Sequence, residues 1–122
     1  MRIAIIGAGG IGGLLGVSLA SAGQDVQFVA RGAHLTAMRG SGLRVTGDRG
    51  DALIRPVRAT DDPATIGPVD LVLFCVKLWD VETVAERIRP LLGAETAVIP
   101  LQNGIDASER LLPILGAAHV LG

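Results

Sequence analysis

Three glycines near the N-terminus have the spacing of a phosphate-binding turn. Gly7, Gly9 and Gly12 follow the aliphatic stretch RIAII at residues 2–6 and precede an apolar stretch with helical spacing. A G-x-G-x-x-G sequence there lets the chain turn tightly, lets a pyrophosphate approach the backbone and lets the helix pack closely on the strand. The anion would lie at a helix N-terminus, where unpaired N–H groups and the helix dipole favour negative charge. Glycines that serve packing alone are the alternative. The residues expected to contact a dinucleotide here are Gly7, Ala8, Gly9, Gly10, Ile11 and Gly12.

The residues after the second apolar segment bear on which dinucleotide is bound. An NAD site usually has Asp or Glu about 20 residues beyond the glycines, where it bonds the ribose 2′-hydroxyl. In the stretch FVARGAH, Ala30 takes that place and Arg31 follows, whereas Asp25 comes too early. A guanidinium can pair with a 2′-phosphate through two hydrogen bonds. We therefore expect Arg31 to bind the cofactor and NADP(H) to be favoured over NAD(H), the alternative being a solvated loop arginine.

Two more polar residues come directly after predicted strands. Lys77, the only lysine, ends LVLFCVK, and Asn103 follows AVIPLQ. Ligands of an open parallel sheet bind outside the carboxyl ends of its strands, and a cation that leaves a buried strand needs an anionic partner. We expect both residues to project into the crevice beside the glycine turn, and we expect Lys77 to pair there with a phosphate or a carboxylate. A surface lysine and a purely structural Asn-Gly turn are the alternatives.

The segments that would position these residues alternate between strands and helices. Apolar runs predict strands at 2–6, 25–30, 69–77 and 96–102, and helical spacing predicts helices at 11–22, 33–42, 80–92 and 106–115, the last interrupted by Pro113. Between them, LRVTG and ALIRPVRAT predict a hairpin or an edge insertion. This alternation predicts an α/β fold of the Rossmann type, a doubly wound parallel sheet with helices on both faces. The final AHVLG starts a further strand, so we expect residues 1–122 to be one NADP-binding domain of a larger protein.

Composition excludes several other classes of protein. The chain has 122 residues, 49% of them hydrophobic, and a formal net charge of -1, which predicts a single globular domain. Its 11 lysines and arginines are scattered, so no basic block favours nucleic acid. The glycines disfavour a signal peptide, and no other apolar stretch approaches the ~20 residues that span a bilayer. Cys75 stands alone, as a buried structural thiol that fits the reducing cytoplasm, and we expect no metal.

The motifs together resemble the N-terminal domain of ketopantoate reductases (2-dehydropantoate 2-reductases). GAGGIGG, ARGAHL, CVKLWD and PLQNG occur in that order, and the resemblance covers essentially the whole chain. It implies NADPH-dependent reduction of 2-dehydropantoate to pantoate, a step toward pantothenate and coenzyme A. It further implies that residues 7–12 hold the pyrophosphate, that Arg31 meets the 2′-phosphate and that Lys77 contacts the cofactor. Asn103 would lie by the nicotinamide and the substrate.

The resemblance also implies a division of labour. The proton-donating lysine of the family and most of its substrate-binding residues lie in a helical C-terminal domain, which is absent from these 122 residues. A positioned acid contributes typically 10²–10⁴-fold to such a reaction, so we expect no catalytic residue here and little catalysis by the isolated chain. The expected partner is a small 2-oxo acid as substrate. Whether the protein forms a homodimer is left open by the sequence. A reductase of another 2-oxo acid and a non-catalytic dinucleotide-binding module are the alternative functions.

Overall fold

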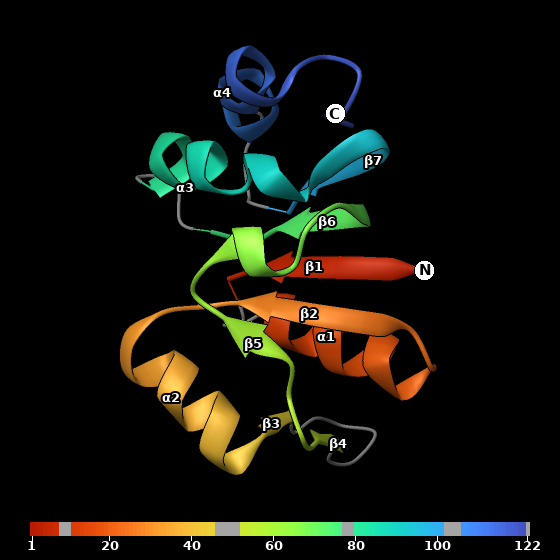
Figure 1. Cartoon of the computed structure of the whole chain (residues 1–122), viewed down its shortest axis with the longest axis vertical. Helices are drawn as coiled ribbons and strands as arrows, with labels where there is room; N and C mark the ends of the chain where they lie inside the picture. The colour runs from red at the N-terminus through yellow and green to blue at the C-terminus, as the bar shows by residue number, and fades with distance from the viewer. Residues whose placement is uncertain (8–10, 46–51, 77–79, 102–105, 122) are drawn as a thin grey trace.

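A central sheet of parallel strands forms the middle of the molecule. The computed structural model describes residues 1–7, 11–45, 52–76, 80–101 and 106–121. Five of its strands form one parallel sheet in the order β5-β2-β1-β6-β7 (Figure 1). Their bounds are β1 Arg2–Ile6, β2 Asp25–Val29, β5 Ala59–Thr60, β6 Val69–Phe74 and β7 Leu92–Pro100. The chain winds outward from β1 first to one side and then to the other, which confirms the predicted Rossmann-type sheet.

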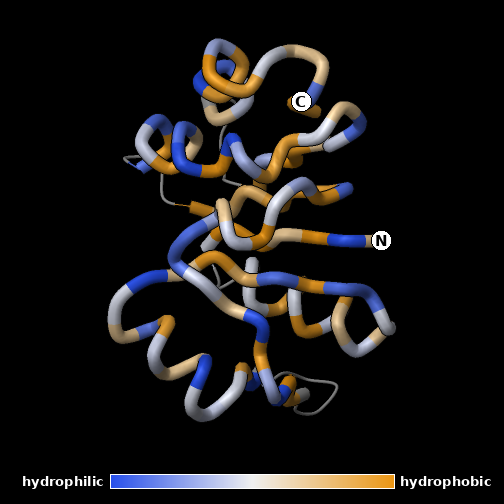
Figure 2. The backbone as a smooth tube through the Cα atoms, viewed as in Figure 1, coloured by the Kyte–Doolittle hydropathy of each residue, from blue (hydrophilic) through white to orange (hydrophobic). Residues whose placement is uncertain are grey.

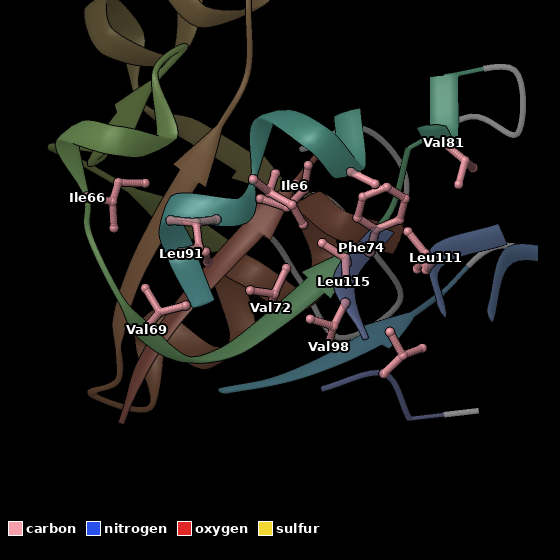
Figure 3. Packing of buried hydrophobic residues seen from close by; sticks show 14 residues of the cluster. Ile6, Ile66, Val69, Val72, Phe74, Val81, Leu91, Val98, Leu111 and Leu115 are labelled. Carbon is pink, nitrogen blue, oxygen red and sulfur yellow. The ribbon is translucent and has the colours of Figure 1, made fainter. Parts of the chain in front are cut away.

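Helices cover both faces of this sheet. They are α1 Ile11–Ser21, α2 Gly32–Ser41, α3 Val81–Arg87 and α4 Asp106–Leu115. Side chains of α1 and α2 pack with β1 and β2 in one hydrophobic cluster, and side chains of α3 and α4 pack with β1, β6 and β7 in a second cluster (Figure 3). In Figure 2, β1 is coloured hydrophobic beyond its first residue, whereas hydrophobic and hydrophilic colours alternate along α2, α3 and α4. The two helical layers confirm the predicted doubly wound architecture.

The central strand shows why its sequence is apolar without alternation. Ile3 and Ile5 belong to the cluster on the α1 and α2 side, whereas Ala4 and Ile6 belong to the cluster on the α3 and α4 side. All four are at most 1% exposed. Successive strand side chains point to opposite faces, so a strand covered on both faces needs apolar residues at every position.

The hairpin is present, but one of its predicted strands divides in two. β3 (Leu43–Val45) and β4 (Ala52–Ile54) pair antiparallel, as predicted. The stretch ALIRPVRAT is not one strand. β4 ends at Ile54, two residues before Pro56, and the last two residues of the stretch form β5, which pairs in parallel with β2. Proline has no N–H group to donate to a sheet. The same stretch therefore serves two different sheets.

Two prolines act differently from each other in the helices. The predicted helix at 80–92 stops at Arg87, and Pro90 lies in a short 3₁₀ turn, η3 (Arg89–Leu91), before β7 begins. Proline disfavours α conformation in the residue before it, which explains the early stop. The interruption expected at Pro113 is wrong, since α4 runs through it. Pro113 lies exposed in the last helical turn, where a carbonyl left without a donor can be reached by water.

The outer strand β7 begins earlier than its apolar pattern predicts and is fixed by a buried hydroxyl. Thr96 is 3% exposed, and its hydroxyl accepts the N–H of Gly93 at 2.8 Å and donates to the carbonyl of Val69 on β6. On the other side of β7, Val98 forms a single parallel bridge with Val120. The strand expected at AHVLG is thus present as one bridge within the described residues.

Candidate functional site

The carboxyl ends of four strands meet at one edge of the sheet. The N–H of Gly7 donates to Val29 at the end of β2 (3.2 Å), and the N–H of Cys75 donates to Ile6 at the end of β1 (2.9 Å). One strand further, the N–H of Leu101 donates to Phe74 at 2.9 Å. The winding reverses between β1 and β6, and ligands of open α/β sheets bind outside the strand ends at such a reversal.

The glycine turn is too tightly packed to carry side chains at its two described glycines. Gly7 has a φ of +87°, and a Cβ on it would lie 3.0 Å from the Cys75 carbonyl oxygen. A Cβ on Gly12 would lie 2.1 Å from the Gly7 carbonyl oxygen. The first turn of α1 therefore packs directly on the end of β1, which brings a helix N-terminus to the strand edge. This arrangement fits a pyrophosphate bound at a helix N-terminus.

The structure describes only part of the remaining residues of the predicted turn. Ala8, Gly9 and Gly10 lie outside the described residues, and their contacts with a dinucleotide stay predictions. Ile11 is the first residue of α1, as the sequence pattern predicted, but its side chain is not described.

Cys75 forms the wall of the turn on the β6 side. A Cβ placed on Gly12 would lie 3.3 Å from the Cβ of Cys75, so the segment after β6 lies close against the start of α1. Burial raises the pKa of the Cys75 thiol to about 11, and its Sγ contacts the Leu73 carbonyl oxygen at 3.7 Å. The thiol is therefore protonated near neutral pH, and Cys75 packs rather than reacts. The sequence predicted a buried structural thiol. The structure shows Cys75 partly buried, and its place beside the turn had no signal in the sequence.

Arg31 lies just beyond the end of β2, where the sequence placed it. The preceding Ala30 is fixed by its N–H bond to the Thr60 carbonyl at 3.0 Å. The backbone of Arg31 is extended at the N-cap of α2, and its side chain is exposed and makes no capping bond. Among the described residues, none accepts a hydrogen bond from its guanidinium or pairs with it. The guanidinium is thus available to an anion at this edge.

Lys77 and Asn103 lie outside the described residues, so their predicted contacts are not tested. The strands that lead to them are neighbours, since Phe74 of β6 is in register with Pro100 of β7. The structure therefore brings the two strand ends together, as expected from a parallel sheet.

An ion pair that no sequence pattern predicted joins the helices that follow these segments. Arg110 of α4 donates through Nε to Oε2 of Glu82 on α3 at 2.5 Å, and its Nη2 donates to Oε1 of the same carboxylate. Hydrogen bonding by Arg110 lowers the pKa of Glu82 below its usual value, against a smaller opposing effect of desolvation. The two residues are separated by 28 positions in the sequence, a spacing that has no local signature.

The described residues show no sign of two other kinds of site. They contain no group of three or more His, Cys, Asp and Glu side chains placed to hold a metal ion. None of the helices in this part of the chain is both long and apolar enough to cross a membrane.

Comparisons with known proteins agree with this geometry. Residues 3–122 match the family described as ketopantoate reductase PanE/ApbA. A 2-dehydropantoate 2-reductase of Mesorhizobium japonicum is 43% identical over 106 residues, which is 86% of this chain and 32% of that protein. The crystal structure of 2-dehydropantoate 2-reductase from Porphyromonas gingivalis superposes with a TM-score of 0.89 at 43% identity and covers 98% of this chain.

The chain is shorter than these proteins, and its fold also resembles that of a D-mandelate dehydrogenase. It spans 32% of the Mesorhizobium protein and 44% of the Porphyromonas chain. A structure of D-mandelate dehydrogenase with NADH and anilino(oxo)acetate superposes with a TM-score of 0.88 at 24% identity. That likeness concerns the fold alone.

Proposed function

Because the chain belongs to the ketopantoate reductase family, we propose that it forms the cofactor-binding part of an NADPH-dependent 2-dehydropantoate 2-reductase. The reaction reduces the ketone of 2-dehydropantoate to pantoate, a step toward pantothenate and coenzyme A. The observation that carries the proposal is the tight packing of Gly12 on Gly7 at the point where the sheet reverses its winding. The family and fold imply a nicotinamide dinucleotide, and this packing suits its pyrophosphate.

Arg31 is the basis for proposing NADP(H) in particular. Its guanidinium would form charge-assisted hydrogen bonds with the 2′-phosphate. Ala30 offers no carboxylate for a ribose 2′-hydroxyl. On the neighbouring strand end, the carboxylate of Asp62 accepts the Ala64 N–H at 3.1 Å and caps the short helix η1 (Pro63–Thr65). That acid is thus engaged in local structure.

In the proposed mechanism, these residues bind and orient the cofactor. The backbone of residues 7–12 holds the pyrophosphate, Arg31 holds the 2′-phosphate, and Lys77 contacts the cofactor. Asn103 lies by the nicotinamide and the substrate. NADPH, when bound, supplies the hydride for the ketone carbon. The alkoxide that develops needs a proton donor, and we assign no residue of this chain to that step.

The cofactor proposal is tested by the affinities for NADPH and NADH before and after Arg31→Ala. Hydrogen bonds to a charged group are worth about 1.5–3 kcal/mol, which corresponds to a loss of roughly 10- to 150-fold in NADPH affinity. Affinity for NADH should change little, because NADH has no 2′-phosphate. Arg44→Ala, at an exposed position of β3, is the matched control. An unchanged ratio of NADPH to NADH affinity would refute the role of Arg31.

The proposed reaction is tested by single-turnover assays with 2-dehydropantoate. We expect the isolated chain to bind NADPH and to oxidise it very slowly, so robust turnover would contradict the proposed division of labour.

A reductase of another 2-oxo acid would keep the same cofactor contacts. Assays of the complete protein with a panel of 2-oxo acids separate that function from the proposed one. A binding module without catalysis would not need Asn103 beside the nicotinamide, so Asn103→Ala should then leave NADPH affinity unchanged.

We also propose a cellular compartment for the protein and an assembly to test. The cytoplasm is the expected compartment, because Cys75 is a free thiol and free thiols persist in reducing compartments. Fractionation of cells tests this location. A homodimer is the assembly to test by light scattering.

A further inference from the structure

The short strand β5 holds the backbone beside Arg31. β5 lies at one edge of the described sheet, next to β2 (Figure 1). The Phe28 N–H of β2 donates to the Arg58 carbonyl at 2.8 Å, and the Ala30 N–H donates to the Thr60 carbonyl at 3.0 Å. The second bond is one residue away from Arg31. The position of Thr60 therefore helps to determine where the chain leaves β2 and enters α2.

A strand of two residues has little pairing of its own to keep it in place. β5 consists of Ala59–Thr60, and both residues are only partly buried. Just beyond it, the Asp62 N–H donates to the Thr60 hydroxyl at 3.1 Å, and the Thr65 hydroxyl donates to the Asp62 carbonyl at 2.7 Å. These bonds join residues of one segment. They fix the shape of the turn after β5 but not its place against the rest of the molecule.

Two arginines attach this segment to helices on opposite faces of the sheet. Arg39, in the last turn of α2, donates through Nε to the Ala59 carbonyl at 3.1 Å. Arg87, at the end of α3, donates through Nη2 to the Asp61 carbonyl at 2.7 Å. These two carbonyls belong to the residues on either side of Thr60. The helices therefore hold the segment at the residue that bonds the end of β2.

The two connections matter locally more than globally. Both arginine side chains are exposed, and substitutions at exposed positions usually change the free energy of unfolding little. A short edge strand, however, is the kind of element that opens locally at low cost. Hydrogen bonds from a charged donor are stronger than those between neutral groups. The bond from Arg87 also spans 26 positions of sequence, so it links β5 to the half of the fold that follows β6.

We propose that Arg39 and Arg87 are positioning residues that hold the end of β5, so that Arg31 keeps the place from which its guanidinium meets the 2′-phosphate. Neither of them contacts the cofactor. The inference rests on the proposed function, because it requires that Arg31 binds the 2′-phosphate of NADPH. Its consequence is selective, since the pyrophosphate is held at the glycine turn and does not depend on β5.

The affinities of the full-length protein for NADPH and NADH provide the first test. Arg87→Ala should weaken NADPH binding by about two- to tenfold, which is part of the loss expected for Arg31→Ala. Arg39→Ala should act in the same direction, and both variants should leave NADH binding unchanged. In the Arg31→Ala background, Arg87→Ala should cause no further loss of NADPH affinity, because its effect passes through Arg31. A merely structural role would lower both affinities whatever residue stands at position 31.

Arg89→Ala is the matched control for the loss of charge. Arg89 lies two residues beyond Arg87, and its side chain is 62% exposed and pairs with Glu86 at 3.4 Å. The substitution removes the same charge from the same region but leaves the bond to the Asp61 carbonyl in place. Both affinities should stay unchanged in this variant. Thermal unfolding of all variants supplies the stability comparison.

Amide hydrogen exchange of the ligand-free protein tests the positioning itself. Arg87→Ala should speed exchange of the Ala30 N–H severalfold, because the Thr60 carbonyl that accepts it is less firmly held. The Cys75 N–H donates to the Ile6 carbonyl at 2.9 Å on the central strand, so its exchange should stay unchanged.

The outcomes separate this inference from the proposed function. Unchanged NADPH affinity in Arg87→Ala, an equal loss of both dinucleotides, or a further loss in the Arg31→Ala background would overturn the inference. An unchanged exchange rate of the Ala30 N–H would also overturn it and would leave the proposed function intact. If the unmodified protein binds neither dinucleotide, the proposed function is wrong and the inference falls with it.

Discussion

A methyl group added at Gly12 should disrupt both the fold and the site. A Cβ there would lie 2.1 Å from the Gly7 carbonyl oxygen, whereas ordinary van der Waals contact begins at 3.4 Å. The obstructing atom belongs to the backbone and cannot rotate away. In Gly12→Ala, the first turn of α1 must therefore retreat from the end of β1 by more than about 1 Å, if ordinary contact is to be restored.

The expected magnitudes follow from this displacement. Overpacking costs typically about 1–3 kcal/mol, and the gain of alanine over glycine in a helix offsets at most about 1 kcal/mol. Because the added Cβ would meet the rigid carbonyl oxygen of Gly7, we expect the cost to be near the upper end of that range, with a net destabilisation of about 2 kcal/mol. A turn moved by about 1 Å exceeds the range of hydrogen-bond lengths. Losing one bond to the pyrophosphate, worth about 1.5–3 kcal/mol, lowers NADPH affinity by a factor of about 10 or more.

Urea denaturation followed by circular dichroism, together with NADPH titration, measures both effects. Gly40→Ala is the matched control, since Gly40 lies in α2 with nothing within 4 Å of an added Cβ. That substitution should stabilise the protein by up to about 1 kcal/mol and leave NADPH affinity unchanged.

A Gly12→Ala variant that is as stable as Gly40→Ala and binds NADPH equally well would refute both expected effects. A loss of stability without a loss of affinity would refute the functional half alone. In that case the packing at Gly12 would serve the fold and not the cofactor.

Two further predictions concern packing around the turn. In Gly16→Ala, an added Cβ would lie 2.4 Å from the Phe28 ring, so the free energy of unfolding should fall by about 1–3 kcal/mol, and a urea midpoint equal to that of the unmodified protein would contradict this. Burial raises the pKa of the Cys75 thiol in the folded protein to about 11, whereas the thiol of the unfolded chain has a pKa near 8.5. Between these two pH values the folded protein keeps the thiol proton and the unfolded chain loses it. Stability should therefore fall as pH rises from about 8.5 toward 11, more than in Cys75→Ala, and iodoacetamide at pH 8 should alkylate the native thiol much more slowly than the unfolded one.

Local sequence patterns predicted the main elements because those patterns reflect burial directly. The apolar run at residues 2–6 belongs to a strand covered on both faces, and the spacing from Ile11 onward belongs to α1. Sequence patterns were less informative for proline, because proline occurs both within helices and just beyond their ends. Pro113 sits within α4, whereas Pro90 follows the end of α3, and the difference depends on whether the chain beyond each proline packs as helix or turns into β7.

The sequence predicted the glycine turn and Arg31 from their distance along the chain alone. The places of Gly7, Gly12 and Arg31 at one sheet edge follow, because a parallel sheet puts all its carboxyl strand ends together. Lys77 and Asn103 remain predictions, since they lie outside the described residues.

Only the tertiary structure decided which distant residues meet. The stretch ALIRPVRAT divides between two sheets because β5 finds its partner in β2, far earlier in the chain. Glu82 and Arg110 pair because α3 and α4 pack side by side, and Cys75 meets the glycine turn because β6 lies next to β1. Periodicity and motif spacing report each segment's own conformation and burial, whereas contacts across the sheet depend on strand order, which no local pattern contains.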